Sequence, residues 1–109
     1  MDIQEKVNLI TMVLFLLTGI LHLLMPFFYP MCFEIIASII YGIIYTILGI
    51  LVQIKKDNKV IAILSIILPL IGLIAGTVAL LPMMDVYILF LLILDPIIII
   101  LRIYIYKTL

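Results

Sequence analysis

The sequence predicts an all-α membrane protein, an antiparallel four-transmembrane-helix bundle with both the N- and the C-terminus cytoplasmic. Three observations lead to this prediction. Of the 109 residues, 69% are hydrophobic and only 11% are charged, whereas a soluble domain is near half apolar and a quarter charged. The apolar residues fall into four long runs, and every Lys and Arg falls at one of three places that share a side in a four-span topology.

Each of the four apolar runs is predicted to cross the bilayer as one helix. Each is close to the ~20 residues that span ~30 Å of hydrocarbon. The first run is too long for a signal-peptide core and lacks small residues at a cleavage site, so we expect it in the mature protein. Because the connectors are short, consecutive helices are expected to be antiparallel neighbours, and residues 1–109 to form one membrane domain. The predicted helices cover residues 7–25, 33–53, 60–81 and 86–106.

The basic residues set the predicted orientation. They occupy the N-terminus, the loop between the second and third spans, and the C-terminal end of the fourth span. Under the positive-inside rule these three regions face the cytoplasm. We therefore expect a multi-pass protein of the cell membrane, in contact with the lipid bilayer. The basic residues are Lys6, Lys55, Lys56, Lys59, Arg102 and Lys107.

Small and polar residues recur at helical spacing on one face of each predicted span. In lipid, such residues face other helices, because close backbone approach and interhelical hydrogen bonds drive association. These faces are therefore predicted to point into the bundle. They comprise Asn8, Thr11, Phe15, Thr18 and His22; then Glu34, Ser38, Gly42, Tyr45, Gly49 and Gln53; then Ala62, Ser65, Pro69, Gly72, Gly76 and Ala79; and finally Ile88, Leu91, Leu92, Asp95, Arg102 and Tyr106.

Asp95 is the principal candidate for a functional residue. It lies roughly 14 Å into the fourth span, close to the membrane midplane. An ionised and unpaired Asp costs about 2.5–3.5 kcal/mol there on insertion scales, so the side chain must be protonated, paired or next to water. A purely structural hydrogen bond between helices is the alternative. Its expected partners at the same depth are Thr18, Tyr41 and Tyr45.

Two prolines and an arginine lie near Asp95 in the predicted spans. Pro96 follows it directly and Pro69 lies at nearly the same depth. Such breaks can free carbonyls for a cation, as in transporters, but membrane helices also tolerate proline without that role, and we favour this second interpretation. Arg102 lies on the same face as Asp95, about 10 Å along the axis. We expect its side chain to snorkel to the cytoplasmic interface rather than reach toward Asp95.

Three polar residues are predicted near the opposite membrane surface. His22 ends the first span and Glu34 opens the second, so the two could pair at the mouth of the bundle, where a titrating His would sense pH. Alternatively, Glu34 only complements the dipole of its own helix. Asp85 is predicted to be the N-cap of the fourth helix.

Several classes of function are not supported by any motif. One His and one Cys cannot supply a standard metal site within one chain, and we expect no cofactor. Because there is no catalytic triad, P-loop or nucleotide fingerprint, we identify no catalytic residue and expect the chain not to be an enzyme. Without a basic patch, nucleic acid is not an expected partner.

Three hypotheses about function remain. The first is a membrane protein that works by association, as a homo-oligomer or as a subunit of a larger membrane complex. It rests on the minimal loops and the small-residue faces. The alternative is a small proton- or cation-coupled transporter or channel that uses Asp95. The third is an accessory to a redox or lipid enzyme whose cofactor another chain supplies.

Overall fold

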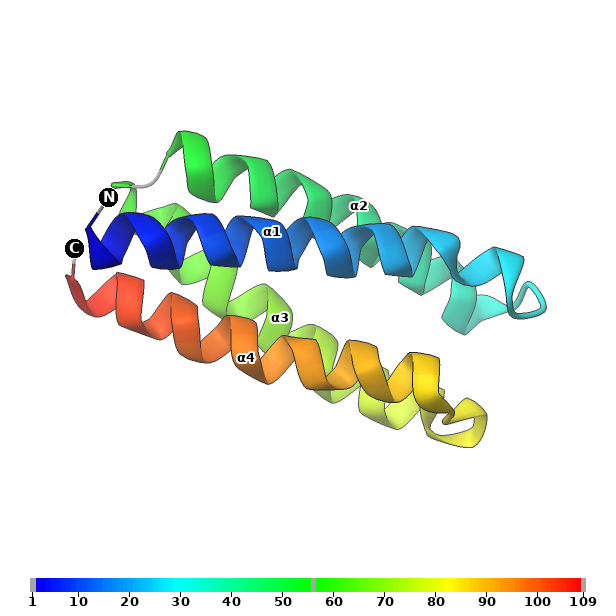
Figure 1. Cartoon of the computed structure of the whole chain (residues 1–109). Coiled ribbons are helices and arrows are strands. Elements are labelled where there is room, and N and C mark those ends of the chain that lie inside the picture. Colours follow the sequence, from blue (N-terminus) through cyan, green and yellow to red (C-terminus); the bar gives the residue numbers. More distant parts are fainter. Residues whose placement is uncertain (1, 56, 109) are drawn as a thin grey trace.

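Four antiparallel α-helices form an elongated bundle of 42 × 22 × 19 Å (Figure 1). This computed structural model describes residues 2–55 and 57–108, apart from the side chain of Met83; Lys56 of the middle loop lies outside the described residues. A short 3₁₀ turn follows α1 and another follows α3. The helices are α1 (Ile3–Leu24), α2 (Phe33–Ile54), α3 (Lys59–Leu80) and α4 (Val86–Thr108), and the turns are Met25–Phe27 and Leu81–Met83.

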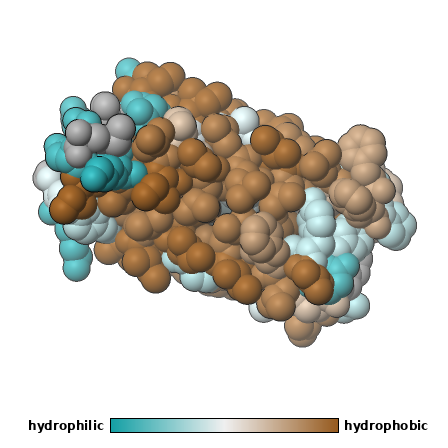
Figure 2. Space-filling view, viewed as in Figure 1, coloured by the Kyte–Doolittle hydropathy of each residue, from teal (hydrophilic) through white to brown (hydrophobic). Residues whose placement is uncertain are grey.

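All four helices are long and apolar enough to cross a membrane. Figure 2 shows a hydrophobic surface along the length of the bundle, with hydrophilic residues gathered at its two ends. The exposed side chains between those ends are mainly Ile, Leu and Val. Such a surface is stable in lipid and not in water. The chain is therefore a small multi-pass membrane protein, and the predicted four-helix, all-α class is confirmed.

At the basic end the helices extend beyond the predicted spans, whereas at the acidic end they begin at the predicted residue or end one residue earlier. α1 starts four residues before the predicted Val7, because the Asp2 side chain caps it by accepting a hydrogen bond from the Glu5 N–H at 2.8 Å. α4 continues to Thr108. Hydrophobicity marks where a helix lies in lipid, whereas capping marks where its hydrogen-bond ladder stops.

Both termini lie at one end of the bundle, together with the α2–α3 loop (Figure 1). There the Gln4 amide donates to the Thr108 hydroxyl at 3.1 Å. We call this the basic end, after Lys6, Lys55 and Lys59. The other end, which we call the acidic end, holds the α1–α2 and α3–α4 loops. Which side of the membrane each end faces stays a prediction.

α1 and α2 pack closely because glycines meet where they cross. A Cβ added at Gly42 would lie 2.8 Å from the Gly19 carbonyl oxygen and 2.9 Å from Leu23 Cγ. One added at Gly19 would lie 2.6 Å from the Thr46 hydroxyl. Backbone approach of this kind lets two helices gain van der Waals contact in lipid. The pair α1–α2 is therefore the tightest seam of the bundle.

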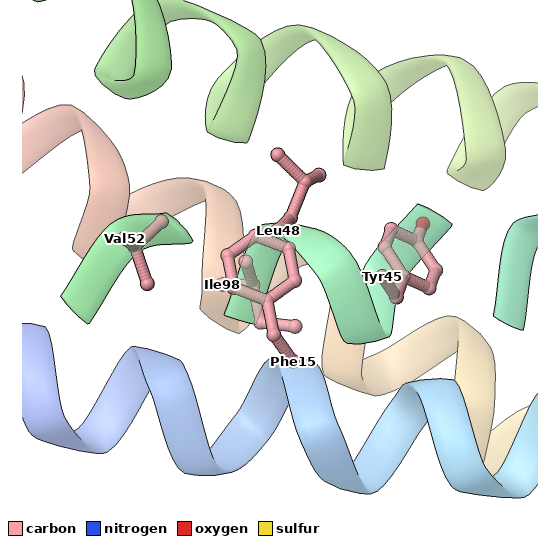
Figure 3. Close-up of a cluster of buried hydrophobic side chains, with 5 residues drawn as sticks. All are labelled: Phe15, Tyr45, Leu48, Val52 and Ile98. Atoms are coloured by element: carbon pink, nitrogen blue, oxygen red, sulfur yellow. The ribbon is translucent and has the colours of Figure 1, made fainter. Parts of the chain in front are cut away.

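The other helices pack around this pair. α4 packs along α3 and also contacts α1, whereas α2 and α3 meet over a shorter length. An apolar layer fills the middle of the bundle, where α1, α2 and α4 converge (Figure 3). It consists of Phe15, Tyr45, Leu48, Val52 and Ile98.

Burial confirms the predicted inward faces of α1 and of most of α2 and α4, and corrects that of α3 and the position of Tyr106 on α4. Tyr106 is 42% exposed, and Ile105 is buried in its place. At the headgroup level an exposed Tyr keeps its ring in contact with lipid and its hydroxyl in contact with water. On α3, Ser65 and Pro69 are buried, but Ala79 near the acidic end is exposed. The predicted face of α3 thus packs inward only in the half nearer the basic end.

The glycine seam yields a first prediction. Gly42→Ala should destabilise the protein by about 1–3 kcal/mol, because the new methyl group overpacks the backbone of α1. Gly76→Ala is the matched control, since its Cβ would meet only Leu92 Cδ2 at 3.5 Å. Both variants gain the same helix propensity. Unfolding in detergent measures the difference, and equal stability of the two variants would contradict close packing at Gly42.

Candidate functional site

Asp95 lies inside the bundle and accepts a hydrogen bond from another helix. Its side chain is 3% exposed. The Tyr45 hydroxyl donates to Asp95 Oδ1 at 3.1 Å, which joins α2 to α4. Asp95 Oδ2 has no hydrogen-bond partner among the described residues, yet it is not one of their fully enclosed polar atoms. One oxygen of the carboxylate is therefore held by α2.

Tyr45 is the predicted partner that binds Asp95, and the structure places the other two elsewhere. The Thr18 hydroxyl lies 3.3 Å from His22 Nδ1. The Tyr41 ring packs against the Tyr45 ring with centroids 5.5 Å apart, and the His22 ring lies edge-on to Tyr45 at 5.3 Å. Figure 3 shows the Tyr45 hydroxyl directed away from Phe15. Tyr45 thus connects Asp95 to the ring of His22.

His22 is fixed by its own helix. Its Nδ1 lies 2.7 Å from the Thr18 carbonyl oxygen. Because a carbonyl only accepts, we assign the proton to Nδ1, which leaves Nε2 as the acceptor of the neutral ring. The described contacts include no hydrogen bond between His22 and Glu34, although both border the same cleft.

That cleft lies between α2 and α3 at the acidic end and has a volume of about 260 Å³. Small residues of α3 form one wall, and a single side chain of α1 reaches its border. Four side chains with polar atoms border it, and the rest of the lining is mostly small or apolar. The polar side chains are His22, Glu34, Ser38 and Tyr41, and the small residues of α3 are Gly72, Ala75, Gly76 and Ala79.

The deep end of the cleft adjoins Tyr45, the residue that donates to Asp95. Gly72 lines the cleft, and a Cβ added to it would lie 2.5 Å from the Tyr45 hydroxyl and 3.1 Å from Tyr41 Cε1. The backbone of Gly72 and the Tyr41 ring are therefore in contact with the phenol that binds Asp95. The cleft ends one residue away from the carboxylate.

Arg102 does not snorkel, so that expectation is wrong. Its side chain is 1% exposed. Its Nε donates to the Ser65 hydroxyl at 2.8 Å, and its Nη1 donates to Asn8 Oδ1 at 2.7 Å and to the Thr11 hydroxyl at 3.3 Å. At this depth the guanidinium finds better acceptors on α1 and α3 than in the headgroups. Among the described residues, no carboxylate takes part in this cluster.

The sequence contained a signal for the Arg102 cluster that reasoning about single residues missed. Asn8, Thr11 and Ser65 all belong to the predicted inward faces. At ~1.5 Å per residue they also lie at the depth of Arg102. Depth along each helix therefore indicates these three residues as partners of Arg102, just as it indicates Tyr45 as a partner of Asp95.

The two prolines do not interrupt their helices. Pro69 lies inside α3 and Pro96 inside α4, and both helices continue through them. Each proline removes one hydrogen bond to a carbonyl four residues earlier. This agrees with the interpretation of proline as tolerated in membrane helices. No described segment at the midplane is unwound.

At the acidic end, Asp85 joins two loops. It caps α4 as predicted, since Asp85 Oδ1 accepts from the Ile88 N–H at 3.0 Å. The Tyr29 hydroxyl donates to Asp85 Oδ2 at 2.5 Å. This hydrogen bond, followed by the Ile88 N–H, lowers the pKa of Asp85. Burial, and then the contact with Asp85, raises the pKa of Tyr29.

No protein-family model, no curated protein and no solved structure matches this chain. No three His, Cys, Asp or Glu side chains of the described residues come together as metal ligands.

A second prediction concerns the guanidinium cluster. Asn8→Leu should destabilise the protein by about 2–3 kcal/mol, because it leaves a buried charge without its shortest hydrogen bond. Arg102→Met should cost less, because it removes the charge itself. The Thr11 and Ser65 hydroxyls still donate to backbone carbonyls, at 2.9 Å and 2.7 Å. The free energy of unfolding of each variant, measured in detergent, tests this order. Thr77→Val, at an exposed hydroxyl, is the control, and a larger loss for Arg102→Met would contradict this order.

A third prediction concerns pH. Because the pKa of folded Asp85 is lowered, its contribution to stability is fully present above the ordinary value of about 3.9 and is lost as pH falls through the folded pKa. Tyr29→Phe should raise this pKa. The stability difference between this variant and the wild type should then shrink in acid. NMR titration of the Asp85 carboxyl and unfolding at two pH values test this, with the exposed Tyr106→Phe as control. An unchanged Asp85 titration would contradict it.

Proposed function

We propose that this chain is a small, non-enzymatic transporter coupled to a proton or a cation, with Asp95 as the group that takes up and releases the ion. One observation carries the proposal. The cleft between α2 and α3 runs from the acidic end to Tyr41 and Gly72, which adjoin the Tyr45 phenol that donates to Asp95. An acid at the midplane is costly, and membrane proteins keep such acids mostly for ion pathways and proton relays.

Asp95 lies behind the deep end of the cleft and is closed off from the basic end, which supports a transporter over an open channel. On its basic-end side lies the apolar layer of Phe15, Leu48, Val52 and Ile98 (Figure 3). The buried charge of Arg102 lies beyond that layer. A fixed positive charge is an electrostatic barrier to cations. A carboxylate that lies close to a cleft on one side and is closed off on the other fits one conformation of an alternating-access cycle.

We further propose that the basic end is cytoplasmic, so that the cleft opens to the outside of the cell membrane. The support is the positive-inside rule, since no Lys or Arg occurs between Lys6 and Lys55 or between Lys59 and Arg102. Membrane-impermeant labelling of intact cells tests the orientation. After Cys32→Ser, Met31→Cys should react and Asp57→Cys should not.

Association, as a homo-oligomer or with another membrane subunit, is the second candidate. One observation favours it. The acidic-end half of α3 leaves Ala75 and Ala79 exposed, although small residues of this kind usually pack against other helices. The mass of the protein in mild detergent tests it, and a strictly monomeric species without a co-purifying partner would contradict it. An oligomeric transporter would satisfy both proposals.

A fourth prediction tests the role of Asp95. In reconstituted vesicles under a membrane potential, the wild type should move protons faster than Asp95→Asn, which should fall to the rate of protein-free vesicles. Asp95→Glu should keep part of the activity, because it retains a carboxyl group. Asp57→Asn, in the exposed loop of the basic end, is the matched control.

Infrared spectroscopy provides a readout that needs no transported substrate. The carboxyl band of Asp95 should respond to the pH of the solution, and Asp95→Asn should remove that response. The proposal fails if the band does not change with pH and the proton flux of Asp95→Asn equals that of the wild type. The Tyr45–Asp95 hydrogen bond would then have only a structural role.

A further inference from the structure

The cleft has the composition of a ligand site. Its walls are mainly apolar, from Ala37 and Phe33 of α2 to Ala75 and Leu80 of α3. Only a few polar groups converge on it. Ligand sites in proteins combine an apolar lining with a small number of placed polar groups. At about 260 Å³, it is smaller than the ~300–1,000 Å³ of sites for drug-sized molecules, so a fitting ligand is small.

The charges around the cleft select a cation. Glu34 borders it, and Asp95 lies behind its deep end. The nearest base is His22, whose Nδ1 proton is directed to the Thr18 carbonyl oxygen, so that its Nε2 can only accept in the neutral ring. The described Lys and Arg residues all lie in the half of the bundle nearer the basic end. The described lining offers carboxylate, phenol and imidazole acceptors, and no permanent cation that could hold an anion.

The aromatic rings at the deep end favour the same class of ligand. Tyr41 and Tyr45 form a corner, with their ring planes at 60° and their centroids 5.5 Å apart. An ammonium group over a tyrosine face gains about 0.5–1 kcal/mol where it is exposed, and about 2 or more where it is desolvated. Of the two rings, Tyr41 lines the cleft, whereas Tyr45 is 0% exposed and packs behind it.

We propose that this cleft binds a small lipophilic ammonium cation, with its charge between Glu34 and the Tyr41 ring and its apolar part against the small residues of α3. The proposal deepens the proposed function by naming the class of substrate, and it rests on that function for the role of Asp95 in transport. Binding itself depends only on the cleft.

The probe is benzyltrimethylammonium, added to the full chain in phosphatidylcholine nanodiscs. Its neutral isostere neopentylbenzene and the anion benzylsulfonate are the matched ligands. Saturation-transfer NMR and the methyl shifts of Ala75 and Ala79 report occupancy. We expect saturable binding of the cation and none of the two controls.

Two variants locate the site. Glu34→Gln removes the charge at the rim and should weaken binding about tenfold, which equals about 1.4 kcal/mol. Gly76→Leu fills the cleft without changing charge, since a Cβ there would meet only Leu92 Cδ2 at 3.5 Å, and should abolish binding. Asp57→Asn, at the basic end, should leave binding unchanged. Circular dichroism and elution volume confirm that each variant folds.

Three results would overturn the proposal. Equal binding of the neutral isostere would show an apolar groove without charge selectivity. Unchanged binding in Gly76→Leu would place the ligand elsewhere. The third result is that the wild type binds no cation and that Gly76→Leu loses an oligomer which the wild type forms. This would show that a second copy of the chain fills the cleft.

Asp95→Asn separates this proposal from the proposed function. If the cation binds while Asp95 shows no response to pH and the variant moves protons like wild type, the proposed function fails and the binding site stands. If Asp95 responds to pH and no cation binds, the binding site fails and proton coupling stands.

Discussion

The structure depends on one constraint, which is that a polar side chain inside the hydrocarbon must find its partners within the bundle. Water is absent there, and each unsatisfied group costs several kcal/mol. Arg102 of α4 meets this constraint by donating to Asn8 of α1 and to Ser65 of α3. Asp95 of α4 meets it through Tyr45 of α2. The two ionisable side chains of α4 thus connect it to all three other helices.

The same contacts explain why the cleft opens at one end only. Ser65 holds α3 to the bundle in its basic-end half. α1 and α2 are already drawn together by Gly19 and Gly42. In the acidic-end half, α3 has no hydrogen bond to α1 or α2 among the described contacts, and Gly76 offers no side chain to fill the space. α2 and α3 therefore separate there, and the cleft follows.

The sequence predicts the spans and the inward faces because hydrophobicity and helical period are properties of single segments. It also predicts the Tyr45–Asp95 contact, since depth in the membrane can be counted along each helix. It does not predict the direction of Arg102, because a long side chain can reach both the interface and the interior. Ile105 and Tyr106 lie on either side of Arg102 around the helix, so which of the two is buried depends on packing. The cleft depends on the distance between two helices, which no single segment determines.

The order of Asp95, Ile98 and Arg102 along α4 makes the two ends of the bundle different. Asp95 lies on the side of the cleft, Ile98 lies one turn further in the apolar layer, and Arg102 lies beyond it. Opening the basic end would have to part the helices that Arg102 joins, and so break its hydrogen bonds to Asn8 and Ser65. Hydrogen bonds to a charged group contribute about 1.5–3 kcal/mol each. The bundle is therefore held closed at the basic end, where Arg102 is buried. It separates most easily at the acidic end, where α3 presents only small side chains.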